Sequence, residues 1–453
     1  MRLRTLFSAK DMTVGKPWKN LLIFTVPMLI GNIVQQLYST VDAIVVGHYI
    51  GDDALSAVGG TMALFFMLLV LFIGVSSGAG IMVSQYFGAK RREDLSHTVG
   101  ACITLTIIVV AFLSVFAPLG TRPLLRLLNT PEGIIDWSVT YINIMLWGSI
   151  GVASYNILSG ILRGLGDSFS PFIYLVIASV TSAVLNVLFV GFFGWGVAGA
   201  AVSTVICQLL SGLLCLRRLM KMQDVFDMGF KYLIPTKKYV MQVVRLGLPV
   251  GASHAVFSVA MIMLQSLINS FGASFMAANT IVMKIDGYVI MPAFSFSNAI
   301  MAFTGQNMGA GKPDRVKQAT RQCAFISVGT CVVVVAAILI FGRQLSSLFT
   351  STEEIMDTSV SILRILSIGY ITLAFANVYW GVLRGAGDTM TPMWASFITT
   401  IAIRVPVAYL FVHYTGRPEG IFYGTLVAWF SLGVYGFCAY KFGKWRTKGI
   451  IRI

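Results

Sequence analysis

Long apolar segments recur along the whole chain of 453 residues. Hydrophobic residues make up 57% of the sequence and charged residues only 11%, whereas an ordinary soluble domain contains about 25% charged residues. A helix needs about 20 apolar residues to cross a hydrocarbon core of roughly 30 Å. The sequence therefore predicts an all-α membrane protein with twelve transmembrane helices. The predicted spans are 19–46, 54–85, 97–118, 135–160, 171–193, 197–216, 246–270, 275–305, 320–342, 358–382, 391–412 and 420–441.

The net charge of +15 is distributed as a membrane topology would place it. Nearly all lysines and arginines lie in the two tails and in the loops on the same side as the tails, and the opposite loops hold only Arg122, Arg126, Arg343 and Arg417. Because cytoplasmic loops carry an excess of Lys and Arg, we expect both termini to be cytoplasmic. The basic charge thus indicates a multi-pass protein surrounded by membrane lipids, and it does not indicate a nucleic-acid partner.

Two halves of the sequence repeat each other. The segment "ILRGLGDSFSP" at 161–171 returns as "VLRGAGDTMTP" at 382–392, 221 positions later. The same offset aligns "QYFGA" at 85–89 with "QNMGA" at 306–310, and a slip of one aligns Pro27 with Pro249. Each half holds six predicted spans, and an even number returns the chain to the same side of the membrane.

The repeat predicts two parallel six-helix lobes, related by a pseudo-two-fold axis along the membrane normal. We expect residues 1–216 to form the N-terminal lobe, 217–245 a basic cytoplasmic linker, and 246–453 the C-terminal lobe. The six cysteines and four histidines show no metal-ligand spacing, so the sequence predicts neither a metal site nor a cofactor.

Several motifs together carry a family resemblance. They are a first span with Gln35, Tyr38 and Asp42 on one face, "GAKRRED" after the second span, "LRGLGD" after the fourth and "GWGVAGAA" at the start of the sixth. In this order, and echoed in a second half, they resemble the multidrug and toxic compound extrusion (MATE) family over essentially the whole chain. The segment "ANTIVMKIDGYVIMPAFSFSNA" is similar to the DinF-like bacterial branch. The resemblance implies a monomeric antiporter of the bacterial cytoplasmic membrane that exports organic, often cationic compounds as protons or sodium ions enter.

Asp42 is the principal candidate for the coupling residue. An ionisable residue inside a membrane span is costly and indicates function. Tyr38 lies four residues before Asp42 and Gln35 seven residues before it, so the three share one helix face. The repeat offset aligns Asp42 with Met263, so only the N-terminal half keeps this acid. We interpret Asp42 as a protonation switch, with a carboxylate that only meets the membrane interface as the alternative.

The resemblance implies further residues of the coupling site. In sodium-binding relatives, an Asn and a second Asp of the fifth span and a Thr of the sixth surround the acid of the first span. The matching positions here are Ser182, Asn186 and Thr204, so the second carboxylate is replaced by Asn186. Because a hard cation prefers charged oxygen ligands, this departure favours H⁺ over Na⁺. Asn156 of the fourth span is a further candidate for the same network. The hydroxyls of Ser182 and Thr204 could instead bond only to their own backbone or a neighbouring helix.

A second polar cluster is predicted in the C-terminal half. It comprises Lys284, Asp286, Arg364 and Arg404, all inside predicted spans. Lys284 and Asp286 are two positions apart and point in different directions on a helix. We expect Asp286 to pair with one of the arginines and Lys284 to line the cleft, with a purely structural ion pair as the alternative.

Three classes of function are compatible with a chain of this kind. A proton-coupled or sodium-coupled MATE antiporter agrees best with the motifs. A flippase for lipid-linked oligosaccharides, from the same superfamily, would be expected to have fourteen spans and a strongly cationic cavity. For a membrane enzyme, the sequence offers no nucleophile with a base and no paired catalytic carboxylates.

Overall fold

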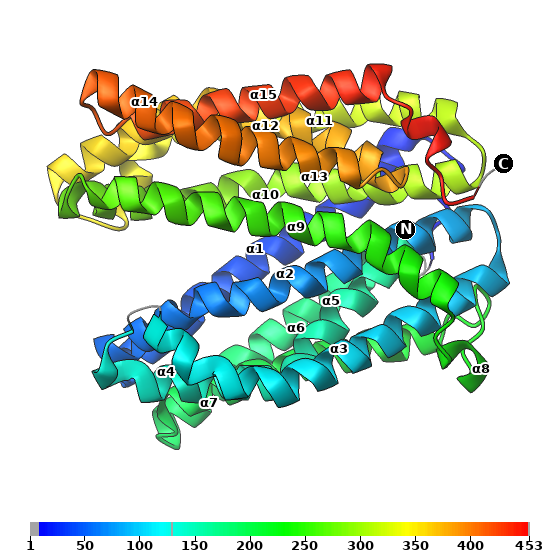
Figure 1. Ribbon diagram of the computed structural model, residues 1–453, viewed down its shortest axis with the longest axis horizontal. Coiled ribbons are helices and arrows are strands. Elements are labelled where there is room, and N and C mark those ends of the chain that lie inside the picture. The colour runs from blue at the N-terminus through cyan, green and yellow to red at the C-terminus, as the bar shows by residue number, and fades with distance from the viewer. Residues whose placement is uncertain (1–8, 128–129, 452–453) are drawn as a thin grey trace. The chain divides into compact units, whose positions relative to one another are not determined.

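The structure, a computed structural model, describes residues 9–127 and 130–451 and contains only helices and connecting segments in those ranges (Figure 1). The first half contains α1 (Pro17–Tyr49), α2 (Asp52–Gly88), α3 (Arg92–Leu127), α4 (Glu132–Trp147), α5 (Ser149–Gly164), α6 (Phe169–Asn186), the π-helix η2 (Val187–Phe192) and α7 (Gly196–Met220). A short helix, α8 (Phe230–Leu233), follows. The second half contains α9 (Lys237–Asn269), α10 (Ala273–Gly309), α11 (Pro313–Ser347), α12 (Glu353–Gly385), α13 (Met390–Phe397), the π-helix η3 (Ile398–Arg404), α14 (Val405–Thr415), α15 (Gly420–Phe442) and η4 (Trp445–Thr447).

The number of membrane-crossing helices agrees with the prediction. The described residues contain 11 helices long and apolar enough to cross a membrane, and 12 if α4 and α5 form one bent span. The all-α membrane fold is therefore confirmed. One element differs, because the predicted straight span 135–160 is a pair of helices bent by 49° at Gly148. A Cβ atom at Gly148 would lie 2.3 Å from a methyl carbon of Val205, so the bend brings the chain against α7 where only glycine fits.

The chain divides into two compact units. The N-terminal unit contains Ile30–Gly251, and the C-terminal unit contains Met12–Leu29 together with the chain from Ala252 onward. These boundaries differ from the predicted lobes 1–216 and 246–453, because the first part of α1 and the first part of α9 each pack with the other half of the sequence. α9 also begins at Lys237, inside the predicted linker. The boundaries between the two units fall two residues after Pro27 in α1 and two residues after Pro249 in α9. Proline lacks the backbone N–H donor of an ordinary helix residue.

In the N-terminal unit, α5 packs between α2, α3 and α7, and α6 packs on α7. The first part of α9 contacts α2 through small residues. A Cβ atom at Gly78 would lie only 2.6 Å from the backbone oxygen of Val243, and one at Gly74 would lie 2.8 Å from that of Gly247. Close approach through small residues is how membrane helices gain packing energy, since lipid gives them little hydrophobic incentive to associate.

In the C-terminal unit, α12 contacts α10, α11 and α15, so it occupies the position that α5 has in its own unit (Figure 1). One core cluster joins the start of α1 to α10, through Leu21, Phe24 and Met28 on one side and Phe296 and Phe303 on the other. A second core cluster fills the space between α10, α12 and α15. The helices that carry the C-terminal polar residues are thereby held in place.

The repeated "GD" segments make the same turn in both units. Gly166 and Gly387 have φ of +85° and +96°, a backbone conformation that favours glycine. The following aspartates then bind the first turn of the next helix: Asp167 accepts from the Ser170 N–H at 2.9 Å, and Asp388 accepts from the Thr391 N–H at 3.2 Å. Each also binds a basic residue, Arg218 at 3.1 Å or Lys448 at 2.8 Å. The duplicated motif is therefore a structural device that closes α5 and α12 and starts α6 and α13.

Candidate functional site

The carboxylate of Asp42 lies inside the N-terminal unit, where it is only 7% exposed. The side-chain amide of Asn186 donates a hydrogen bond to Asp42 Oδ1. Asn186 is the last residue of α6 and directly precedes the π-helix η2, and its side chain is fully buried. Short π-helical turns interrupt the regular hydrogen-bond ladder and occur often at functional sites. The structure thus brings together the acid and the amide that the sequence proposed as partners.

One turn before Asp42, the phenol of Tyr38 joins α1 to two other helices. Ser182 Oγ of α6 donates to Tyr38 Oη at 3.0 Å, and Thr204 Oγ1 of α7 lies 2.9 Å from the same oxygen. Tyr38 and Asp42 are four residues apart on α1, and Ser182 and Asn186 are four residues apart on α6. Two parallel helices therefore carry two successive polar rungs, about one 5.4 Å turn apart. We call these five residues the α1 polar cluster.

The polar cluster contains one unused acceptor. Asn186 Oδ1 is buried and has no hydrogen-bond partner among the described residues. A buried amide oxygen without a donor costs about 1–3 kcal/mol and calls for a physical reason. Here the unused oxygen and the carboxylate of Asp42 lie at the same place, which is an arrangement that can accept a proton donor or a cation.

Apolar residues seal the cluster on one side. Val45 and Val46 of α1 pack with Tyr141 of α4 and with Ala200 of α7 in one buried core. Tyr141 is also close enough to interact electrostatically with Asp42 and Tyr38. Tyr141 was not predicted from the sequence, because a tyrosine inside an apolar span carries no signal that separates a core ring from a site residue.

Two predicted members lie outside the cluster. The side chain of Gln35 is exposed on α1. Asn156 donates from Nδ2 to Val152 O of its own helix at 2.8 Å, and its backbone oxygen accepts from Ser76 at 2.6 Å. The C-terminal unit repeats both bonds, with Asn377 donating to Leu373 O at 3.0 Å and its backbone oxygen accepting from Ser297 Oγ at 2.7 Å. Asn156 thus belongs to a duplicated helix contact and does not join the Asp42 network.

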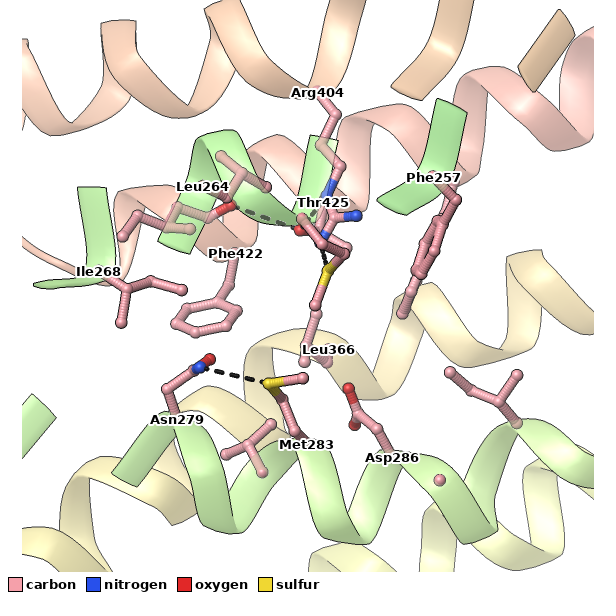
Figure 2. A pocket seen from close by; sticks show the side chains of 16 residues that line it. Phe257, Leu264, Ile268, Asn279, Met283, Asp286, Leu366, Arg404, Phe422 and Thr425 are labelled. Atoms are coloured by element: carbon pink, nitrogen blue, oxygen red, sulfur yellow. Dashed lines mark hydrogen bonds between the residues drawn. The ribbon is translucent and has the colours of Figure 1, made fainter. Parts of the chain in front are cut away.

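The C-terminal polar residues form a smaller group than predicted. Asp286 of α10 and Arg404 of η3 line one pocket (Figure 2). Lys284 and Arg364 are exposed and are not among the residues that line it. The predicted ion pair between Asp286 and an arginine is absent among the described residues. Asp286 instead accepts a hydrogen bond from the phenol of Tyr370 on α12, and Arg404 Nε donates to Thr425 Oγ1 at 3.1 Å. Tyr370 and Thr425 were not predicted as members of this group from the sequence.

Within the described part of the chain, no three His, Cys, Asp or Glu residues come together in a way that could hold a metal ion. The six cysteines are all unpaired, and all except Cys438 are buried.

Comparison with known proteins identifies the family. The family model described as MatE matches residues 27–188 and again residues 249–410, so its two copies begin at Pro27 and Pro249. The chain is 32% identical over 446 residues to "Probable multidrug resistance protein YoeA" of Bacillus subtilis, covering 96% of both chains. It is 28% identical to "Probable multidrug resistance protein NorM" of Thermotoga maritima, covering 96% of this chain and 94% of that one.

Solved structures agree with the sequence comparison. One described as "Outward-facing conformation of a multidrug resistance MATE family transporter of the MOP superfamily" superposes with a TM-score of 0.90 at 25% identity, covering 96% of this chain and 97% of that one. Proteins of this family are membrane transporters and not enzymes. The chain therefore belongs to the MATE family of multidrug efflux transporters.

Proposed function

We propose that this protein exports amphipathic organic compounds from the bacterial cytoplasm in exchange for protons, with Asp42 as the residue that binds and releases the proton. The observation that carries the proposal is the buried pair of Asp42 and Asn186. Burial in a membrane span disfavours an ionised carboxylate, so a bound proton or cation changes the energy of the site strongly.

The partner of Asp42 is suited to both protonation states. A primary amide has two N–H donors and one oxygen acceptor. When Asp42 is ionised, the Asn186 amide donates to it, as observed. When Asp42 is protonated, its O–H can donate to the unused Asn186 Oδ1 after a rotation of the amide group. The amide thus stabilises each state with a hydrogen bond and needs no movement of the backbone.

Proton transfer supplies enough free energy for export. One elementary charge that moves across 100 mV releases roughly 2.3 kcal/mol. That energy corresponds to about a fifty-fold concentration ratio of an exported compound without net charge, whereas exchange of one proton for one organic cation moves no net charge and is driven by the pH gradient. A single titrating carboxylate per cycle is therefore sufficient to drive useful transport.

A sodium-coupled antiporter is the second candidate. The unused oxygen of Asn186 and the hydroxyl groups of the cluster are oxygen ligands of the kind that a hard cation prefers. Two facts favour the proton. Asp42 is the only carboxylate of the α1 polar cluster, and the hydroxyls of Tyr38, Ser182 and Thr204 already bind one another.

We further propose that both termini are cytoplasmic, on the evidence of the lysines and arginines concentrated in the tails and in the loops on their side. The function is tested in everted membrane vesicles with ethidium as the fluorescent organic cation. We expect a pH gradient alone, in sodium-free buffer, to drive uptake of ethidium into the vesicles. Uptake that requires sodium and is unchanged by removal of the pH gradient would replace this proposal with the sodium-coupled one.

A further inference from the structure

The C-terminal unit contains a pocket between α9, α10, η3 and α15 that carries one charged group of each sign (Figure 2). The volume of the pocket is about 230 Å³. Its walls are mostly apolar and include Met261, Met283 and Phe422, which are flexible or aromatic side chains that adapt to varied ligands. The charged groups are Arg404, which enters from η3, and Asp286, which rises from α10.

The guanidinium of Arg404 has unused hydrogen-bonding capacity. Nε donates to Thr425, Nη2 makes a weak contact of 3.8 Å with the sulfur of Met261, and the ring of Phe257 lies 5.7 Å away. Nη1 is buried and has no partner among the described residues. A planar guanidinium with free N–H groups in an apolar pocket is the usual receptor for a carboxylate.

The carboxylate of Asp286 also lacks a cationic partner. Its hydrogen bond comes from the neutral phenol of Tyr370, and no lysine, arginine or histidine nitrogen of the described chain lies within 4.0 Å of it. Lys284 is two residues away on α10 and is exposed. Arg404 interacts with Asp286 electrostatically but at a longer range than an ion pair. Two opposite charges therefore face one pocket without neutralising each other directly.

The backbone around Arg404 fixes this arrangement. Gly424 of α15 packs so closely that a Cβ atom there would lie 2.8 Å from the backbone oxygen of Arg404. Thr425 is the next residue of α15 and holds Nε. Asp286 and Arg404 are each partly buried, and partly buried charges that are kept apart cost free energy that direct pairing would offset in part. A fold that holds them apart is therefore expected to use them for binding.

We propose that this pocket binds an amphipathic zwitterion, with Arg404 receiving its carboxylate and Asp286 its ammonium group. A volume of about 230 Å³ is below the 300–1,000 Å³ typical of whole drug-sized ligands. The occupant is thus the size of an aromatic amino acid, or is the charged end of a larger compound.

The two charged residues of the pocket have no charged counterparts at the aligned positions of the N-terminal half. The repeat offset of 221 aligns Asp286 with Phe65 and Arg404 with Ala183, both uncharged. The proposed coupling acid Asp42 has Met263 at its aligned position. The two units are thus specialised differently, and this ligand site does not depend on proton coupling at Asp42. The proposed ligand site rests on the proposed function in one respect only, because the bound compound is taken to be one that the protein exports.

The test is equilibrium binding to the purified full-length protein in detergent, without any gradient. The probes are tryptophan, which is a zwitterion, tryptophan methyl ester, which keeps only the ammonium, and N-acetyltryptophan, which keeps only the carboxylate. Mildly acidic buffer keeps the amine of the ester protonated. Hydrogen bonds to charged groups are worth about 1.5–3 kcal/mol, so we expect tryptophan to bind at least about ten-fold more tightly than either derivative.

The variants assign each charge to one end of the ligand. Arg404→Gln is expected to remove the preference for tryptophan over its ester, and Asp286→Asn the preference over N-acetyltryptophan. Arg364→Gln and Lys284→Gln are the matched controls, because both side chains are exposed and lie outside the pocket. Affinities of both controls should equal that of the wild type.

The wild-type comparison alone decides the matter if a variant fails to fold. Equal affinity for the three probes, or no binding of tryptophan up to about 10 mM, would overturn the proposal. Binding of glycerophosphoethanolamine but not of tryptophan would also overturn it, since the occupant would then be a lipid headgroup. Because no gradient is present, a failure of proton coupling leaves each of these results unchanged.

Discussion

The side-chain amide of Asn186 donates a hydrogen bond to the carboxylate of Asp42, across two helices whose contact residues are 144 positions apart in sequence. One turn earlier, Ser182 donates to Tyr38 at the same separation of 144. The equal separation shows that α1 and α6 run in the same direction in register at this point. The hydrogen bond to the proposed coupling residue therefore joins two helices and is not local to one of them.

The phenol of Tyr38 is expected to stabilise this contact without carrying the proton. Tyr38→Phe removes the oxygen shared by Ser182 and Thr204 and keeps the ring. We expect the free energy of unfolding to fall by about 0.5–1.5 kcal/mol per lost hydrogen bond, while each exported molecule still requires a proton. Thermal denaturation and transport in proteoliposomes measure the two effects. Tyr414→Phe is the control, since Tyr414 is 82% exposed. Loss of proton coupling in Tyr38→Phe would assign the phenol a role in the proton path.

A second carboxylate is expected to convert the site toward sodium. Asn186→Asp places another acid beside Asp42, and two carboxylates are the ligands that a hard cation prefers. A ligand that binds only the folded state raises the melting temperature with its concentration. The melting temperature of Asn186→Asp should therefore rise with sodium chloride and not with choline chloride, while that of the wild type responds equally to both salts. Equal responses of the variant would show that the amide does not set the ion preference.

The paired aspartates of the repeat are expected to be structural. Asp167→Ala removes the carboxylate that binds Arg218 and the Ser170 N–H, and Asp388→Ala removes the carboxylate that binds Lys448 and the Thr391 N–H. Each substitution should cost about 1–3 kcal/mol of stability. The loss should be greater for Asp167, because Arg218 is 15% exposed and Lys448 is 44% exposed. Transport normalised to folded protein should persist in both. A selective loss of transport with unchanged stability would contradict a structural role.

The parallel repeat is testable by labelling single cysteines in a cysteine-free background. Glu93 and Asp314 are exposed at aligned positions and should react with a membrane-impermeant maleimide only from the cytoplasmic side. Glu132 at the start of α4 and Glu353 at the start of α12 are a second pair of exposed, aligned positions. In the proposed topology they lie on the opposite side of the membrane, so they should react only from outside. If Glu93→Cys and Asp314→Cys were labelled from opposite sides, the two halves would be inverted and the topology proposed here would be wrong.

Much of the fold and part of the candidate site could be predicted because they depend on local rules. Apolar length sets the spans, and the i, i+4 spacing places Tyr38 and Asp42 on one face. The bend at Gly148 could not be predicted, since it arises from the close contact with Val205 of α7. The exposure of Lys284 and Arg364 could not be predicted either, because a charge inside a span does not reveal which face of its helix is buried. Asn156 looked like a site residue, yet its amide bonds to its own helix.

The central claim is that Asp42 couples protons to export, and Asp42→Asn tests it most directly. The measurement is proton uptake together with ethidium efflux in proteoliposomes, normalised to monodisperse protein, for the wild type, Asp42→Asn and the control Asp136→Asn. Asp136 is an exposed acid of α4, and its carboxylate pairs with Arg122 near the end of α3. We expect Asp42→Asn to fold, because an amide keeps the shape of the carboxyl group and can still form a hydrogen bond with Asn186. Both fluxes should stop in this variant, while the control transports normally. Near-normal coupled transport by Asp42→Asn, with or without a loss of thermal stability, would show that Asp42 is not the coupling residue.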